Sequence, residues 1–99
     1  MVFILVSVNK LVGMKVITAK AYVLGEVKGL EANVESWKIT HLLIRLSEKA
    51  GIDLGFKKRF GSATVSMPVE LVKAVGEFVS IDKSFEELSR TVDIVEYKE

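Results

Sequence analysis

The chain has 99 residues, no cysteine, one histidine and a formal net charge of +1. This length suits one domain, and 49% hydrophobic residues supply a core without disulfides or a structural metal. The absence of cysteine excludes disulfide frameworks, thiolate nucleophiles and sulfur-ligated zinc, and it is typical of a reducing compartment, so we expect a cytoplasmic protein. A net charge this small does not by itself predict binding to nucleic acid.

The first predicted element is a strand in the apolar segment 2–8. This segment is too short to cross a bilayer and lacks the basic start of a signal peptide, so we expect no membrane span. Its apolar residues occupy both faces of the strand, as do those of the last predicted strand, 92–97. Such strands need cover on both faces, so we expect the two ends to pair with each other or with a second copy in a homodimer. The alternative is an interface for a different protein. The residues predicted for self-association are Val2, Phe3, Ile4, Leu5, Val95 and Tyr97.

Between these ends, a period-two alternation and frequent β-branched residues indicate that strands dominate. The predicted strands lie near 14–18, 22–30, 37–46, 62–67 and 78–81, and the predicted turns lie at 19–21, 32–36 and 47–60. Gly25 stands inside one of these strands. A glycine there is typical of a bend or of a close approach between two backbones, as a tightly curled sheet requires.

Two short helices are predicted in the second half of the chain. A helical spacing of apolar residues opens after Pro68 and closes at Gly76. Ser84 and Glu87 have the spacing of a capping box just ahead of Leu88. With no linker or repeat, the whole chain 1–99 is read as a single domain that is mainly β and contains one or two short helices. Its short strands must stack as two sheets or close into a barrel to hide their edges.

In order and spacing, six short motifs resemble the PRC-barrel family, which includes barrel domains of the photosynthetic reaction-centre H subunit and of a bacterial ribosome maturation factor. The motifs are Leu11-Val12-Gly13, Lys15-Val16, Leu24-Gly25-Glu26-Val27, Trp37-Lys38-Ile39-Thr40-His41-Leu42, Val65-Ser66-Met67-Pro68-Val69 and Val75-Gly76-Glu77-Phe78-Val79. The segment from Trp37 to Leu88 is similar to short stand-alone versions found in archaea. The resemblance implies a small barrel of about six to seven strands over residues 10–88, one that mediates contacts and has no family-wide catalytic residues.

The densest basic cluster is Phe56-Lys57-Lys58-Arg59-Phe60, in which two aromatic residues flank three cations. Cations pair with phosphates while bases stack on rings, so this loop is the candidate contact for RNA or for another partner. The alternative is an exposed loop whose phenylalanines fold back onto the barrel while the lysines keep it solvated.

The remaining chemistry-bearing residues favour structural roles. His41 has no second nitrogen or sulfur ligand for a transition metal, and no spacing provides it with a nucleophile, so we expect a structural hydrogen bond from it. Trp37 begins a predicted strand and is expected to pack in the core, the alternative being an anchor that faces a partner. We therefore predict no catalytic residue, no metal site and no cofactor.

The leading hypothesis is a non-enzymatic protein-interaction or adaptor module that associates with itself and with an unidentified protein. The alternative is an RNA-associated module, acting in RNA processing or ribosome maturation, that binds through Lys57, Lys58 and Arg59 with the flanking Phe56 and Phe60.

Overall fold

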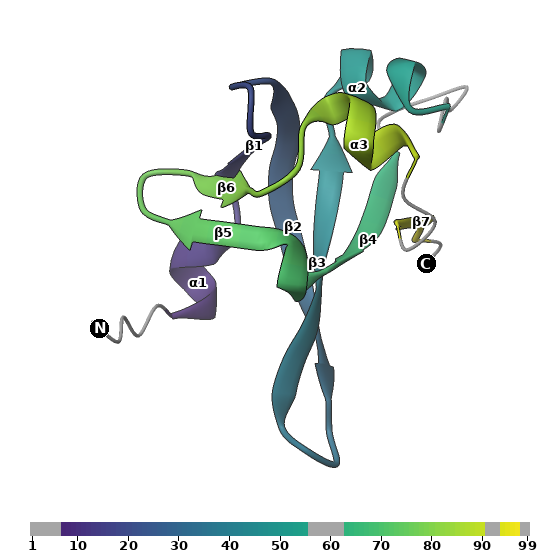
Figure 1. Ribbon diagram of the computed structural model, residues 1–99. Helices are drawn as coiled ribbons and strands as arrows, with labels where there is room; N and C mark the ends of the chain where they lie inside the picture. Colours follow the sequence, from purple (N-terminus) through teal and green to yellow (C-terminus); the bar gives the residue numbers. More distant parts are fainter. Residues whose placement is uncertain (1–6, 56–62, 91–93, 98–99) are drawn as a thin grey trace.

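A computed structural model describes residues 7–55, 63–90 and 94–97. The chain is mainly β with short helices (Figure 1). The strands are β1 (Lys15–Ile17), β2 (Val23–Asn33), β3 (Lys38–Leu46), β4 (Thr64–Pro68), β5 (Val72–Val75), β6 (Val79–Ile81) and β7 (Val95–Glu96). The helices are α1 (Val8–Leu11), α2 (Glu48–Asp53), α3 (Phe85–Ser89) and the 3-10 turn η1 (Val69–Leu71).

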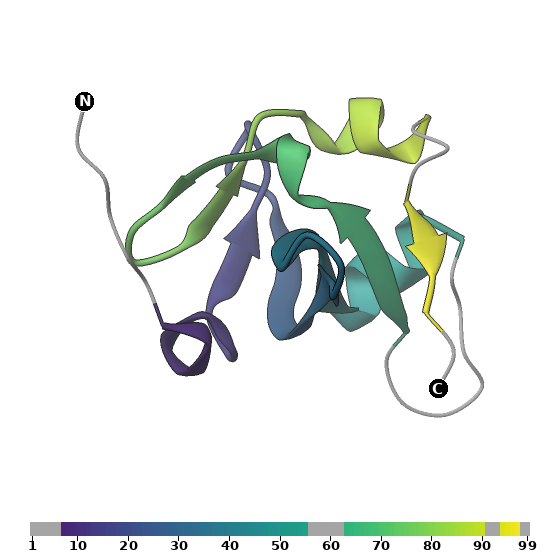
Figure 2. The same ribbon diagram turned by 90° about the horizontal axis from the view of Figure 1, so that it is seen from below.

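The described strands form one sheet in the order β5-β6-β1-β2-β3-β4-β7. All neighbours are antiparallel except β1 and β6, which run parallel. Viewed along the β2–β3 hairpin, the sheet curves, and α3 lies across the side between β6 and β7 (Figure 2). In this order β5 and β7 stand at opposite edges, and no strand pairing joins them within the described residues. The described sheet is therefore not closed, and the expected barrel remains a prediction.

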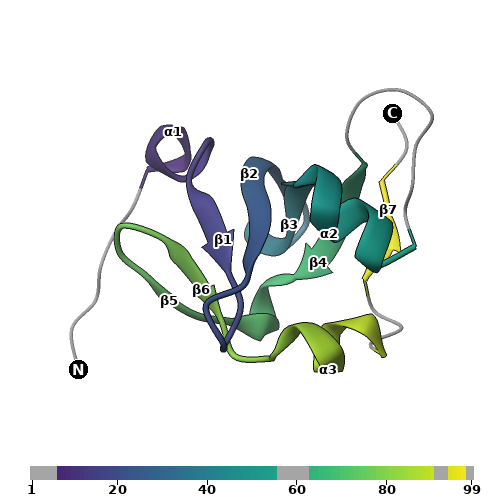
Figure 3. The ribbon, with the colours of Figure 1, turned by 90° about the horizontal axis from the view of Figure 1, so that it is seen from above.

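The core lies inside the curve of the sheet. Its fully buried side chains are mostly branched aliphatic residues that alternate along the strands, as a one-sided sheet requires. They are Val16, Leu24, Val27, Leu42, Ile44, Leu46, Val65, Met67, Val79 and Ile81, with Leu88 from α3. Seen from above, α2 and α3 lie at the end of the sheet where β3 finishes (Figure 3). The β2–β3 hairpin extends in the other direction, beyond this core (Figure 1).

Most predicted strands are present, including 22–30 and 37–46, which become the long strands β2 and β3. The predicted helix from Pro68 to Gly76 is wrong beyond its first turn, because η1 ends at Leu71 and β5 follows. Val72 pairs with Ile81 and Val75 with Val79, so valines that fit a helical spacing also fit an antiparallel pair.

Two other segments differ from prediction. The end of the predicted strand 2–8 and the residues after it form α1, while residues 1–6 lie outside the described residues. The predicted turn 47–60 contains α2, whose N-cap Ser47 accepts a hydrogen bond through its side chain from the Ala50 N–H. Ser47 was a usable cap signal, since serine satisfies a free N–H at a helix start.

Candidate interaction surface

The outer part of the β2–β3 hairpin, residues 30–42, is called the arm. Among the described residues, the most exposed large apolar side chains lie at its tip. Val34 is 68% exposed and Trp37 is 79% exposed. Leu30 and Leu42, which pair with each other, are the last arm residues packed on the core. At the next pair, Glu31 and His41, strand β4 still contacts the arm, because His41 pairs with Pro68. Beyond this pair the arm projects with no other described element beside it (Figure 1).

Hydrogen bonds hold the backbone of the tip. The Asn33 side-chain oxygen accepts from the N–H groups of Glu35 at 2.9 Å and Ser36 at 3.2 Å, and the Trp37 N–H donates to the Asn33 carbonyl at 2.7 Å. Asparagine is favoured at such a position because its side chain mimics a backbone turn. The tip therefore presents Val34 and Trp37 from a fixed loop.

The prediction that Trp37 packs in the core is wrong. Strand β3 begins one residue later, and Trp37 closes the turn with a left-handed backbone, φ 57°. A bulky side chain in that region is rare, since its Cβ crowds the following carbonyl. Asn33, three residues after the last firmly apolar position of β2, was the sequence signal for a turn that ends at Trp37.

A small cavity lies at the other end of the β2–β3 hairpin. It has a volume of about 280 Å³, and its floor is made by Val23, Gly25 and Leu46. A Cβ on Gly25 would overlap the carbonyl oxygen of Arg45, so β2 and β3 approach here more closely than any other residue allows. The predicted close approach at Gly25 is thus confirmed.

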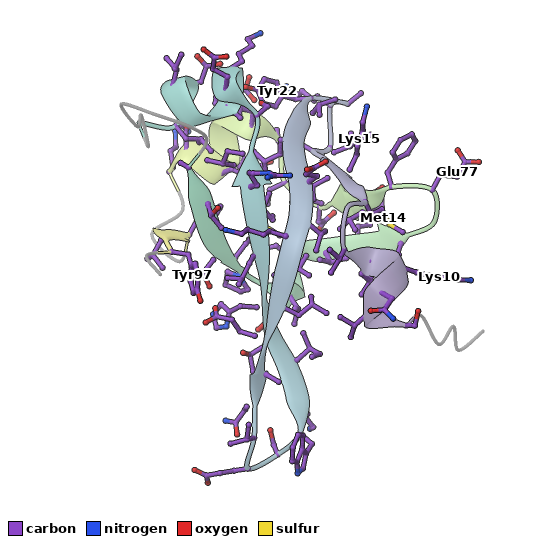
Figure 4. All side chains as sticks on the ribbon, turned by 180° about the vertical axis from the view of Figure 1, so that it is seen from behind. Lys10, Met14, Lys15, Tyr22, Glu77 and Tyr97 are labelled. Carbon is purple, nitrogen blue, oxygen red and sulfur yellow. The ribbon has the colours of Figure 1, made fainter. Side chains whose placement is uncertain are left out.

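Charged side chains form the rim of this cavity. Lys15 pairs in register with Glu26, and Glu26 pairs with Arg45, so the signs alternate across three neighbouring strands. The Arg45 guanidinium donates to the Glu26 carboxylate, and both side chains stay about half exposed. This face of the sheet is turned toward the viewer in Figure 4, where Lys15 projects at the cavity end of the hairpin and no helix covers β2.

Further along the same face, a polar network links β2, β3 and β4. The Ser66 hydroxyl donates to the Glu31 carboxylate at 2.6 Å. The His41 Nδ1 lies 2.9 Å from the Thr40 hydroxyl, so the predicted structural hydrogen bond of His41 is confirmed. Because Ser66 bonds directly to a carboxylate, this hydroxyl is not arranged for activation by an imidazole.

Tyr22 anchors the two helices at the cavity end. Its hydroxyl donates to the Asp53 carboxylate at 3.1 Å, its ring centroid lies 4.5 Å from that of Phe85, and the Lys49 ammonium lies 5.6 Å from the ring centroid. Desolvation by burial, followed by the hydrogen bond and the charge of Asp53, raises the pKa of the Tyr22 hydroxyl above its usual value. The cluster packs α2 and α3 against the start of β2.

The predicted contact residues fall partly outside the described chain. Phe56, Lys57, Lys58, Arg59 and Phe60 lie there, as do Val2, Phe3, Ile4 and Leu5, so both sets remain predictions. The RNA hypothesis rests on the first set, and its test is RNA binding that weakens steeply with salt.

The other two residues predicted for self-association are described. Val95 is 54% exposed in β7, which pairs with β4, and the N–H of Tyr97, a half-buried residue, donates to the Thr64 carbonyl at 2.8 Å. In Figure 4 Tyr97 lies at the β4 side of the sheet, well away from the arm tip.

Within residues 7–55, 63–90 and 94–97, no three histidine, aspartate or glutamate side chains gather as metal ligands. None of the helices described there has the length and apolar character needed to cross a membrane. No protein-family model matches the sequence, and no curated protein matches it.

Proposed function

We propose that this chain is a protein-interaction module of the PRC-barrel type, which acts by binding rather than catalysis and associates with itself. The observation that carries the proposal is the arm: a hydrogen-bonded turn that holds Trp37, at 79% exposure, beyond the core. Exposed tryptophan is unfavourable in water and is enriched among the residues that dominate protein interfaces. A fixed backbone lowers the entropy lost when such a side chain is bound.

The sheet supports the same proposal. It is strand-rich, has one aliphatic core and is flanked by short helices, and a mainly β chain with short helices is the coarser part of what the resemblance implies. On the outer face, Ser66 bonds to Glu31 and Arg45 bonds to Glu26, each across strands. The apolar tip is therefore the feature of the described surface with the largest gain from contact with another protein.

Light scattering over a range of micromolar concentrations tests self-association. We expect the mean mass to rise toward that of a dimer with concentration, and the Val34→Ser variant to shift this rise to higher concentration. Ile52→Ser is the matched control, because Ile52 is 54% exposed on α2, away from the arm. A mass that stays monomeric throughout would contradict self-association.

A further inference from the structure

We propose that Trp37 of one copy inserts into the cavity at Gly25 and Arg45 of a second copy, and that the second copy returns the same contact. This inference rests on the proposed self-association and adds the surface through which it occurs. The proposal connects two features of the described chain. One is an exposed tryptophan with a positive φ, and the other is a cavity open to solvent on the outer face of the sheet.

Two properties of Trp37 are unfavourable in the unbound chain, the exposure of its side chain and the φ of its backbone. Its side chain is 79% exposed, and its backbone has a positive φ that glycine or asparagine would adopt more easily. Among the described residues, its indole N–H has no hydrogen-bond acceptor. Burial of the indole against a partner with an acceptor would recover the apolar surface and satisfy this donor together.

The cavity has the size and chemistry to receive one indole. Binding sites for drug-sized ligands are usually about 300–1,000 Å³, so 280 Å³ suits a single large side chain. The floor of Val23, Gly25 and Leu46 offers apolar contact. At the rim, the cations Lys15 and Arg45 can lie over an aromatic face, and the Glu26 carboxylate has lone pairs beyond those used by Arg45.

Charge complementarity favours a second copy over lipid or nucleic acid. Glu35 stands two positions before Trp37, and it would meet the cavity that carries Lys15 and Arg45. The tip has only Lys38 beside it as a cation, so it lacks the cluster of positive charge that phosphates attract. An anionic membrane would repel the Glu35 carboxylate, which lies at the tip of the arm.

The tip and the cavity lie at opposite ends of the same hairpin, so one dimer can form both tip-to-cavity contacts. Trp37 precedes β3 and Leu46 ends it, so tip and cavity are about 30 Å apart at roughly 3.3 Å per residue. Two hairpins lying antiparallel across a two-fold axis place each tip at the other's cavity. Closed two-fold contacts of this kind repeat the same pair of surfaces and leave no free end for further growth.

Intrinsic fluorescence tests the proposal directly, because Trp37 is the single tryptophan of the chain. We expect its emission to move to shorter wavelength, and acrylamide quenching to fall, over the concentrations at which light scattering reports dimers. The Trp37→Asn variant, which retains a residue tolerant of positive φ, should weaken association about thirtyfold or more. Thermal unfolding of dilute Trp37→Asn checks that the fold is retained.

A mixing experiment distinguishes the proposed dimer, in which each copy inserts Trp37 into the cavity of the other, from other dimers. This reciprocal contact is called the exchange. Val23→Glu places a carboxylate on the cavity floor, facing Glu35, but keeps Trp37, whereas Trp37→Asn keeps the cavity. Each variant alone should be mostly monomeric. Together they can form one intact contact, so adding tryptophan-free Trp37→Asn to Val23→Glu should shift the emission to shorter wavelength. The double variant Val23→Glu/Trp37→Asn is the control and should cause no shift.

The outcomes separate this inference from the proposed function. If the wild type dimerises but its emission does not change, or if the mixture gives no shift, the exchange is overturned while self-association stands. If the wild type stays monomeric, both are overturned. If the emission shifts with anionic vesicles or RNA and not with protein concentration, the tip belongs to another class of partner and the exchange is again overturned.

Discussion

At the scale of single residues, Gly25 and Trp37 show how backbone geometry selects a side chain or opposes it. Gly25 is required, because any Cβ there would overlap the Arg45 carbonyl. Trp37 is the opposite case, since its φ of 57° would suit a smaller residue and its side chain is 79% exposed. Strain of this kind is a reason to look for function at the residue that bears it.

Two glycines in the same strand allow a matched test of this geometry. Gly25→Ala should lower the free energy of unfolding by about 1–3 kcal/mol, because the new methyl group must push β2 and β3 apart. Gly29→Ala should leave it nearly unchanged, since its Cβ would meet only the Leu43 Cδ1, at an ordinary 3.5 Å. Urea denaturation measures both. Equal losses from the two variants would contradict the close approach.

At the scale of elements, the capping box of α3 is the clearest case of a local signal that the fold keeps. The Ser84 side chain accepts from the Glu87 N–H at 3.3 Å, and the Glu87 carboxylate accepts from the Ser84 N–H at 3.1 Å. These local bonds need no tertiary information, so the spacing of the two residues was sufficient to predict them. The arm turn depends equally on local bonds at Asn33, and the predicted turn 32–36 is confirmed. What the sequence prediction missed is that Trp37 closes this turn and does not begin the buried strand.

The capping box gives α3 a predictable dependence on pH. The Ser84 backbone hydrogen bond, followed by that of its side chain, lowers the pKa of the Glu87 carboxyl below its usual 4.5. A group with a lowered pKa in the folded state adds stability above its unfolded pKa and loses it as the pH falls through the folded value. Wild type should therefore exceed Glu87→Gln in stability at pH 7, and the difference should vanish in acid below the usual carboxyl range.

Thermal unfolding of both proteins across this pH range measures the effect. Glu70→Gln is a suitable control, because Glu70 is an exposed glutamate in η1, outside α3, and its side chain has no hydrogen bond within the described residues. A stability difference between wild type and Glu87→Gln that is the same at acid and neutral pH would contradict a charged capping box.

At the scale of the whole molecule, the sheet order sets which parts are most firmly held. Strand β3 is paired along most of its length on both sides, with β2 and with β4. Among the described strands, the edge strands β5 and β7 each have one partner, and β7 pairs with β4 through Val95 and Glu96. The core is thus concentrated around β2, β3 and β4, with less support at either edge.

Amide hydrogen exchange tests this gradient at low protein concentration. We expect the slowest exchange at Leu42 and Ile44 of β3, where the side chains are buried and both neighbouring strands are present. Exchange should be faster in β5 and β7, because local opening needs fewer contacts to be broken there. Uniform protection across the sheet would mean that the edges are covered in a way the described chain does not provide.

The sequence by itself determined the features that depend on neighbours along the chain. Period-two alternation located β2, β3 and β4, the glycine inside a strand predicted a close approach, and serine with glutamate three residues later predicted the start of α3. It did not separate helix from strand after Pro68, since the spacing of Val72 and Val75 suits both.

Only the tertiary structure decided what lies outside the core. The length of the arm beyond Leu30 and Leu42 depends on where the other strands end, which no local pattern records. The cavity arises where β1, β2 and β3 meet, and it brings together Lys15, Glu26 and Arg45 from separate parts of the sequence. Burial and cavities depend on contacts between distant residues, so the candidate interaction surface became visible only in the folded chain.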